Sequence, residues 1–169
     1  MDIPQLETES LVLRGPREAD YPVYRDFYAD AEASAAYGGP LVPAAAWKRL
    51  AGDLGHWLLR GYGMWSVARK SDGMMAGGCG LVWPDGWPRP ELTWWVVPAA
   101  RRQGIALEAS RAAIAFGYDA LGWKQVETHM DDGNEAARNL ALKLGGEVCA
   151  RETFPDGKTR SIYALPRGG

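Results

Sequence analysis

The chain has 169 residues, of which 47% are hydrophobic and 24% charged, and 19 Lys and Arg against 21 Asp and Glu give a net charge of −2. This length and apolar content are typical of one folded domain with a sizeable core, and they exclude a disordered or fibrous protein. The balanced charge argues against nucleic acid as the main partner, and the lack of a membrane-spanning run or signal sequence predicts a cytoplasmic protein without a membrane partner.

The first third of the chain predicts a strand followed by two helices. Alternating apolar residues predict a strand over residues 8–14, which a Gly-Pro pair ends. Asp20 is a candidate N-cap, and the apolar stripe after it predicts a helix over residues 20–30. A glycine-containing loop then leads to a second helix that begins at Pro43. Apolar residues at helical spacing predict its core face: Trp47, Leu50, Leu54, Trp57 and Leu58.

The rest of the chain predicts three neighbouring strands, then helices that alternate with strands. A Ser-Asp-Gly turn between two apolar runs is typical of a hairpin. The predicted strands are 63–69, 75–83, 91–97, 124–130, 147–154 and 158–165, and the predicted helices are 104–121, ended by Gly122, and 134–144. Because no repeat or linker interrupts this order, residues 1–169 are predicted to form a single domain.

The turn between the third of these strands and the Ala-rich helix carries the clearest chemical signal. A strand there runs into a basic turn that contains Gly104 and becomes a helix N-terminus. Such a turn presents unpaired backbone N–H groups and partial positive charge, which favour an anion such as pyrophosphate. Gly104 lets the backbone approach phosphates closely, and Arg101 and Arg102 can add charge-assisted contacts. The glycine-rich dinucleotide and P-loop patterns are absent from this turn.

The same residues resemble a known motif. Arg101-x-x-Gly104-x-Ala106 is similar to the Gln/Arg-x-x-Gly-x-Gly/Ala acetyl-CoA-binding motif of the GNAT N-acetyltransferase superfamily. Residues 8–14 and 132–145 also resemble the branch that contains ribosomal-protein N-terminal acetyltransferases. The resemblance implies a GNAT fold of the α/β (α+β) class, with a mixed, mostly antiparallel sheet of about seven strands, four helices and the order β-α-α-β-β-β-α-β-α-β-β.

The resemblance also implies an enzyme that moves acetyl from acetyl-CoA, its co-substrate, to a primary amine by direct attack in a ternary complex. The amine belongs to a peptide or protein N-terminus or to a small molecule. The implied cofactor-binding residues are Trp95, Val96, Val97, Arg101, Arg102, Gln103, Gly104, Ile105, Ala106 and Asn134. Backbone groups near the first three of these are expected to bind the pantetheine arm and to polarise the thioester carbonyl.

Two side chains are candidates for the chemistry itself. The attacking amine must lose a proton, and a carboxylate can accept it. Glu91 opens the third strand, where the family carries a matching Glu, so we expect it to be the base; a surface carboxylate at a strand end is the alternative. Asn134 is the second candidate, which we expect to lie against the cofactor arm, and its residue type also suits a helix N-cap.

The sequence departs from the family where a proton donor is usual. The position that is Ser in this branch is Ala137, and the Tyr of many other members falls on Ala141. Another group or water must then protonate the departing thiolate. These departures keep a second function open, namely a CoA-binding sensor or interaction module that has lost catalysis, and a longer acyl-CoA donor is a third reading.

The chain holds eight tryptophans and three phenylalanines. Three tryptophans on the strand and loop beside the expected acceptor site are predicted to line it: Trp83, Trp87 and Trp94. The two cysteines, Cys79 and Cys149, are predicted to be core thiols, and His56 and His129 to be structural. No metal site is predicted from so few ligands. The acceptor's identity stays open, and a homodimer is compatible with the pattern.

Overall fold

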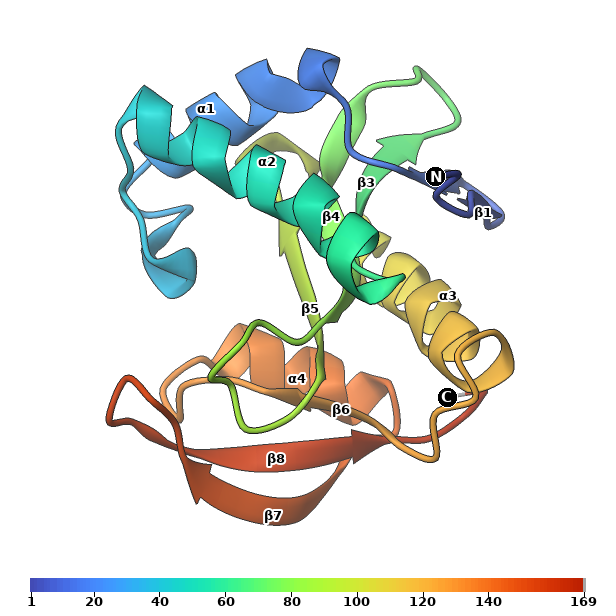
Figure 1. Ribbon diagram of the computed structural model, residues 1–169, viewed down its shortest axis with the longest axis vertical. Coiled ribbons are helices and arrows are strands. Elements are labelled where there is room, and N and C mark those ends of the chain that lie inside the picture. The colour runs from blue at the N-terminus through green and yellow to red at the C-terminus, as the bar shows by residue number, and fades with distance from the viewer. Residues whose placement is uncertain (169) are drawn as a thin grey trace.

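The computed structural model describes residues 1–168, and its strands form two sheets (Figure 1). The larger sheet has the strand order β1-β2-β3-β4-β5 and the smaller one the order β6-β8-β7, with antiparallel pairing in both. The strands are β1 (Leu6–Glu7), β2 (Leu11–Arg14), β3 (Met64–Arg69), β4 (Met75–Val82), β5 (Glu91–Val96), β6 (Val126–His129), β7 (Glu147–Thr153) and β8 (Thr159–Leu165). The helices are α1 (Tyr21–Ala29), α2 (Pro43–Arg60), α3 (Ile105–Asp119) and α4 (Glu135–Lys143). The predicted fold class is confirmed.

Only the second half of the predicted first strand, residues 8–14, forms a strand, which is β2; the short β1 precedes the predicted range. A carboxylate of α3, that of Glu108, accepts hydrogen bonds from the backbone N–H and the hydroxyl of Ser10, at 2.8 and 2.6 Å. Thr8 donates to the same carboxylate. These bonds hold residues 8–10 in a turn, so the alternating pattern of the sequence continues through a segment that pairs with no strand.

The larger sheet lies between α3 on one face and α1 with α2 on the other. Side chains of β5 alternate between these faces, as a strand requires. Trp95 packs against Tyr24 and Phe27 of α1, whereas Leu92 and Trp94 belong to the core cluster that α3 covers. The face of β5 that carries Trp95 therefore also carries its first residue, and it is the face beneath α1.

Close packing at the centre of this sheet depends on glycine. A Cβ atom at Gly77 would lie 2.0 Å from the Trp95 carbonyl oxygen, and one at Gly80 would lie 2.2 Å from the Gly63 carbonyl oxygen. Real Cβ atoms do not approach backbone this closely. The glycines of β4 therefore let β3 and β5 close on it from both sides.

The predicted core face of α2 is partly wrong. Leu50 and Trp57 are buried, but Trp47 is 43% exposed, and Leu54 and Leu58 are exposed as well. The apolar residues of this helix cover more than one side, and only the side that faces the sheet and α1 is covered. No helix within the described residues is both long and apolar enough to cross a membrane.

The two cysteines and His56 also have defined places. Cys79 of β4 is buried as predicted, but Cys149 is exposed on β7, because that strand forms an edge of the smaller sheet. His56 joins α2 to the larger sheet: its Nδ1 lies 2.6 Å from the Tyr62 carbonyl oxygen, and its Nε2 accepts a hydrogen bond of 2.9 Å from the Trp83 N–H. Both ring nitrogens are thus occupied by backbone, which confirms a structural role.

Candidate active site

The strand β5 has one edge that pairs with β4 and one that meets no backbone ladder, because β6 belongs to the other sheet. Val97 N–H donates to the Ala76 carbonyl at 2.8 Å, so by the alternation of antiparallel bonds Trp95 also turns its backbone groups toward β4. Leu92 and Val96 turn theirs the other way. Their carbonyls accept side-chain hydrogen bonds, from Thr128 Oγ1 at 2.9 Å and Arg101 Nε at 3.4 Å respectively.

The open edge of β5 therefore presents the backbone of alternate residues. The N–H of Val96 and both backbone groups of Trp94 have no backbone partner on β4 under this alternation. Trp95, Val96 and Val97 were expected to offer free backbone groups, and Val96 does so. The backbone groups of Trp95 and the N–H of Val97 instead form hydrogen bonds with β4. The Trp95 side chain, 3% exposed, is part of the core.

Beyond β5 the chain turns into α3 through four exposed residues, Arg101, Arg102, Gln103 and Gly104. Arg102 and Gly104 both have positive φ, 61° and 74°, and Arg102 is the only residue other than glycine with such a φ among residues 1–168. Consecutive N–H groups in this kind of turn make a concave donor surface for anions. Nothing lies within 4 Å of an ideal Cβ at Gly104, so the space above the turn is open.

After the turn, Ile105 is buried and Ala106 half-buried at the start of α3. The first backbone bond of the helix runs from the Glu108 N–H to the Gly104 carbonyl at 3.0 Å. The N–H groups of residues 105–107 precede that bond, as at any helix N-terminus. The predicted turn thus leads into a helix N-terminus, and its N–H groups lie at the end of β5 where the open edge also ends.

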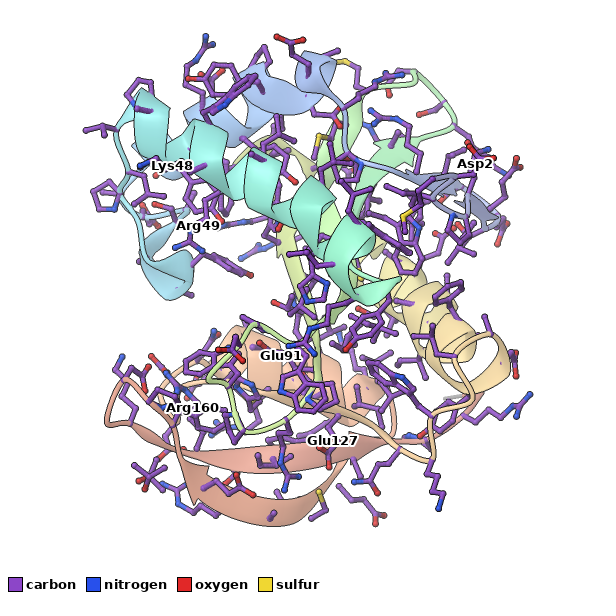
Figure 2. The ribbon with its side chains drawn as sticks, viewed as in Figure 1. Asp2, Lys48, Arg49, Glu91, Glu127 and Arg160 are labelled. Carbon is purple, nitrogen blue, oxygen red and sulfur yellow. The ribbon has the colours of Figure 1, made fainter. Side chains whose placement is uncertain are left out.

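Glu91 is the first residue of β5, and its side chain is buried on the face of the strand that also carries Trp95. Its carboxylate Oε2 lies 2.7 Å from Nε2 of His129, the last residue of β6. Figure 2 shows Glu91 near the middle of the molecule, between the half that carries α2 and the half that carries β7 and β8. The surface-carboxylate alternative is therefore wrong, because Glu91 is 8% exposed and contacts the other sheet.

Aromatic rings surround this pair. Phe154, which follows β7, has its ring centroid 4.3 Å from that of His129, and Trp87 of the β4–β5 loop packs edge-on to Phe154 at 5.4 Å. Trp83 donates a hydrogen bond of 2.9 Å from its ring nitrogen to the Trp87 carbonyl, which ties the start of the loop to its middle. Trp83 and Trp87 are both half-buried. Sequence reasoning did not identify His129 or Phe154 as part of this site.

Trp94 lies apart from the other predicted acceptor residues. It is paired with Cys79 across the β4–β5 ladder, and both side chains are on the α3 face. Cys79 Sγ lies 3.8 Å from Ser110 Oγ of α3, and burial raises the pKa of its thiol to about 12. The structure therefore brings Glu91 and Trp87 together around His129 and puts Trp94 on the other side of β5. Trp83 lines a separate hollow with Tyr62 and Trp123.

The helix α4 begins at the N-cap Asn134, whose Oδ1 accepts a hydrogen bond of 3.1 Å from the Ala137 N–H. The amide nitrogen of that side chain forms no hydrogen bond with the protein within residues 1–168 and is available to a ligand. Ala141 is buried beside Met130 and Tyr163, while Ala137 packs at the rim of the same cluster. Neither alanine can donate a proton.

Comparison with known proteins identifies the family of the chain. The acetyltransferase (GNAT) domain family matches residues 10–147, which is most of the chain. The chain belongs to the GNAT acetyltransferase family. A stretch of 82 residues of this GNAT chain is 27% identical to YoaA, an uncharacterized N-acetyltransferase of Bacillus subtilis strain 168, and covers 48% of the chain. The match spans about half of that relative, 46% of its length.

Solved structures resemble the GNAT chain over almost its whole length. An acetyltransferase from Agrobacterium tumefaciens strain C58 is 27% identical with a TM-score of 0.89, covering 98% of this chain and 96% of that one. RimL, a ribosomal alpha-N-protein acetyltransferase, is 15% identical with a TM-score of 0.77, covering 95% and 93%. A GNAT-family acetyltransferase from Bacillus anthracis is 14% identical with a TM-score of 0.82, covering 98% and 100%. The likeness to the last two concerns the fold.

Proposed function

We propose that this GNAT chain transfers acetyl from acetyl-CoA to a primary amine, which attacks directly while both substrates are bound. The observation that carries the proposal is that β5 connects two groups that this reaction requires, namely a proton acceptor for the amine and a turn that can bind the cofactor. A buried carboxylate, that of Glu91, opens the strand, and the strand's unpaired edge leads to the anion-binding turn at Gly104. Membership of the GNAT family supports the interpretation of this turn as the part that binds acetyl-CoA.

The residues present fit acetyl-CoA, which supplies the activated acetyl thioester when bound. The open space at Gly104 and the donors of the turn suit a diphosphate, and the exposed Arg101 and Arg102 add positive charge beside it. The free N–H of Val96 and the free amide of Asn134 suit a chain of amides and carbonyls. A backbone N–H directed at the charge that develops on a thioester oxygen lowers the activation free energy by about 3 kcal/mol.

In this proposal Glu91 takes the proton that the amine must lose. It lies on the same face of β5 as Trp95, and its burial keeps water from competing for the carboxylate. The thiolate that leaves is a tolerable leaving group near neutral pH, so water can protonate it without a donor at Ala137 or Ala141. The missing acid lowers the rate without preventing the reaction.

The acceptor side offers an aromatic wall in the half-buried Trp87, with the buried Phe154 packed behind it. Such a wall favours an amine with an apolar or cationic body. RimL acts on a ribosomal protein N-terminus by its name, and this GNAT chain shares its fold. We therefore propose peptide N-termini as the first acceptor class to test, with polyamines and amino acids as comparisons.

The replacement of both usual acids by Ala137 and Ala141 favours a second candidate, a CoA-binding sensor without catalysis. One experiment separates the two. CoA is added to wild type and to Glu91→Gln while the melting temperature is measured, and thiol release from acetyl-CoA is followed with the acceptor panel. We expect CoA to stabilise both proteins by mass action and Glu91→Gln to lower kcat by about a hundredfold or more.

The outcomes of this experiment lead to different conclusions. Stabilisation by CoA without turnover of any acceptor supports the sensor. No stabilisation at millimolar CoA contradicts both candidates. Turnover that Glu91→Gln leaves unchanged keeps the transferase and removes Glu91 from its mechanism.

A further inference from the structure

His129 Nε2 is a buried polar atom without a hydrogen bond. It lies 2.7 Å from the Glu91 carboxylate, but the contact is not aligned as a hydrogen bond, and no other partner for it exists among residues 1–168. The His129 side chain is 8% exposed, so water does not readily replace the missing partner. An unsatisfied buried nitrogen costs free energy, and such a cost is often found where an atom has a chemical task.

The ring of His129 is held in place from two sides. Phe154 packs on it at a centroid distance of 4.3 Å with 43° between the planes, and Trp87 lies edge-on at 6.5 Å. Backbone pairing of His129 with Ile162 fixes the strand beneath. Packing therefore fixes the position of the imidazole, with Nε2 close to the Glu91 carboxylate but not aligned with it.

The other charged side chains around the pair already have partners of opposite charge. Arg89 lies in the β4–β5 loop, and Arg160 of β8 packs over the Phe154 ring with its guanidinium carbon 4.9 Å from the centroid. The ion pairs are Arg89 with Glu127 and Glu152, and Arg160 with Asp131 and Asp156. Figure 2 labels Glu127 and Arg160 in the half of the molecule that carries β7 and β8. Within residues 1–168 the Glu91 carboxylate forms no ion pair with these arginines, and its one charged or titratable contact is His129.

On the basis of the proposed function, we propose that His129 is a positioning residue that receives, through Glu91, the proton given up by the amine. The relay requires a carboxylate at Glu91 and an imidazole at His129 whose proton is on Nδ1 and whose Nε2 carries a lone pair. An N–H bond of the substrate ammonium breaks as an O–H bond forms on Glu91. That O–H bond then breaks as an N–H bond forms at Nε2 of His129.

The pair finishes as a carboxylate beside an imidazolium, so Glu91 regains its charge while the amine keeps its lone pair for attack. The imidazolium later releases one proton to solvent, which restores the starting state. The poor alignment in the unliganded protein does not oppose this role, because catalytic hydrogen bonds often align only when substrate is bound.

The kinetic test uses His129→Gln, which keeps a polar side chain at the contact but cannot accept the proton, and His129→Phe, which keeps the aromatic packing. We expect both to lower kcat at neutral pH by ten- to a hundredfold and to recover as pH rises, because the amine then arrives already deprotonated. The melting temperature and the stabilisation by CoA report whether each variant is folded. If one variant does not fold, the kcat and pH profile of the other variant test the proposal.

A double variant separates action through Glu91 from a structural effect. If His129 acts through Glu91, the pair Glu91→Gln with His129→Gln is no slower than Glu91→Gln alone, since effects within one unit are not additive. A structural role predicts that the two losses multiply at every pH. That result, or a pH profile unchanged by His129→Gln, overturns the proposal.

Spectroscopy provides a readout that needs no turnover. The chain has two histidines, so nitrogen NMR of histidine-labelled protein shows two imidazoles, which His56→Gln assigns. We expect Glu91→Gln to move the Nε2 resonance of His129 and to leave that of His56 in place. A wild type that turns over no amine refutes the proposed function and the relay together, whereas an active wild type with an unmoved His129 resonance refutes the relay alone.

Discussion

Tyr24 of α1 donates a hydrogen bond of 2.7 Å to Asp53 of α2, and this bond ties together the two helices above the site. Burial raises the pKa of Asp53 to about 6, although the Tyr24 hydrogen bond and the charge of Arg49 act in the opposite direction. A carboxyl whose pKa is raised on folding stabilises the protein below its unfolded pKa, and this contribution is lost as pH rises through about 6.

Asp53→Asn should therefore stabilise the protein at pH 7.5 but not at pH 4. The amide still accepts the Tyr24 hydrogen bond and carries no charge to bury, so we expect a gain of up to about 2 kcal/mol at the higher pH. Urea unfolding of both proteins at the two pH values measures the difference. A variant that is less stable at both would show that the charge of Asp53 is needed for its packing.

Asp20 shows the opposite behaviour. Burial alone would raise its pKa, but hydrogen bonds from Arg14, from Ser66 and from the Arg17 N–H outweigh burial and hold the pKa below its ordinary value. Its contribution is present above the unfolded pKa near 3.8 and is lost as pH falls through the folded pKa.

Asp20→Asn should cost about 3 kcal/mol near neutral pH, because it leaves the guanidinium of Arg14 without a counter-charge. The cost should shrink in acid, where wild type loses the same charge. Asp26→Asn is a suitable control, since Asp26 pairs with Arg25 on the exposed surface and should change little. Equal effects of the two substitutions in urea unfolding would contradict the importance of burial.

Gly104→Ala tests the anion-binding turn. Both Gly104 and Gly73 have positive φ, 74° and 70°, with open space around the Cβ position, so each alanine should cost about 1 kcal/mol of backbone strain. Gly73 lies in the β3–β4 turn, and Gly73→Ala should leave CoA affinity unchanged. We expect Gly104→Ala to weaken CoA about tenfold in calorimetric titration. Equal affinities in the two variants would move the cofactor away from this turn.

Trp87→Ala should change acceptor preference more than stability, because the side chain is half-buried at the rim of the proposed acceptor site. We expect kcat/KM to fall about tenfold for acceptors with an apolar or cationic body and less for small amines. Trp47→Ala, on the exposed side of α2, is the matched tryptophan control. A large loss of melting temperature with unchanged preference would make Trp87 a core residue.

The sequence predicted the element order and the anion-binding turn because both depend on local patterns. Glycine with positive φ at the start of a helix is such a pattern, and Gly104 has that conformation. The prediction that Trp94 lines the acceptor site together with Trp83 and Trp87 did not take account of the alternation of β5. That alternation puts Trp94 on the α3 face, opposite Trp95.

The contacts that the sequence could not predict are those between the two sheets. His129 meets Glu91 only because β6 ends beside the start of β5, and no local pattern specifies that arrangement. The open edge of β5 likewise depends on which strands fail to pair. Cys149 was misplaced for a related reason: β7 is an edge strand because β8 inserts between it and β6.

The order of strands also bears on how the chain assembles during synthesis. In the larger sheet, spatial order follows chain order, so each new strand finds its neighbour already made. The smaller sheet differs, because β6 pairs with β8. This pairing cannot form until β7 and β8 have left the ribosome. The nascent chain can thus complete its larger sheet with Glu91 in place, whereas the strand that bears His129 is fixed only when β8 arrives.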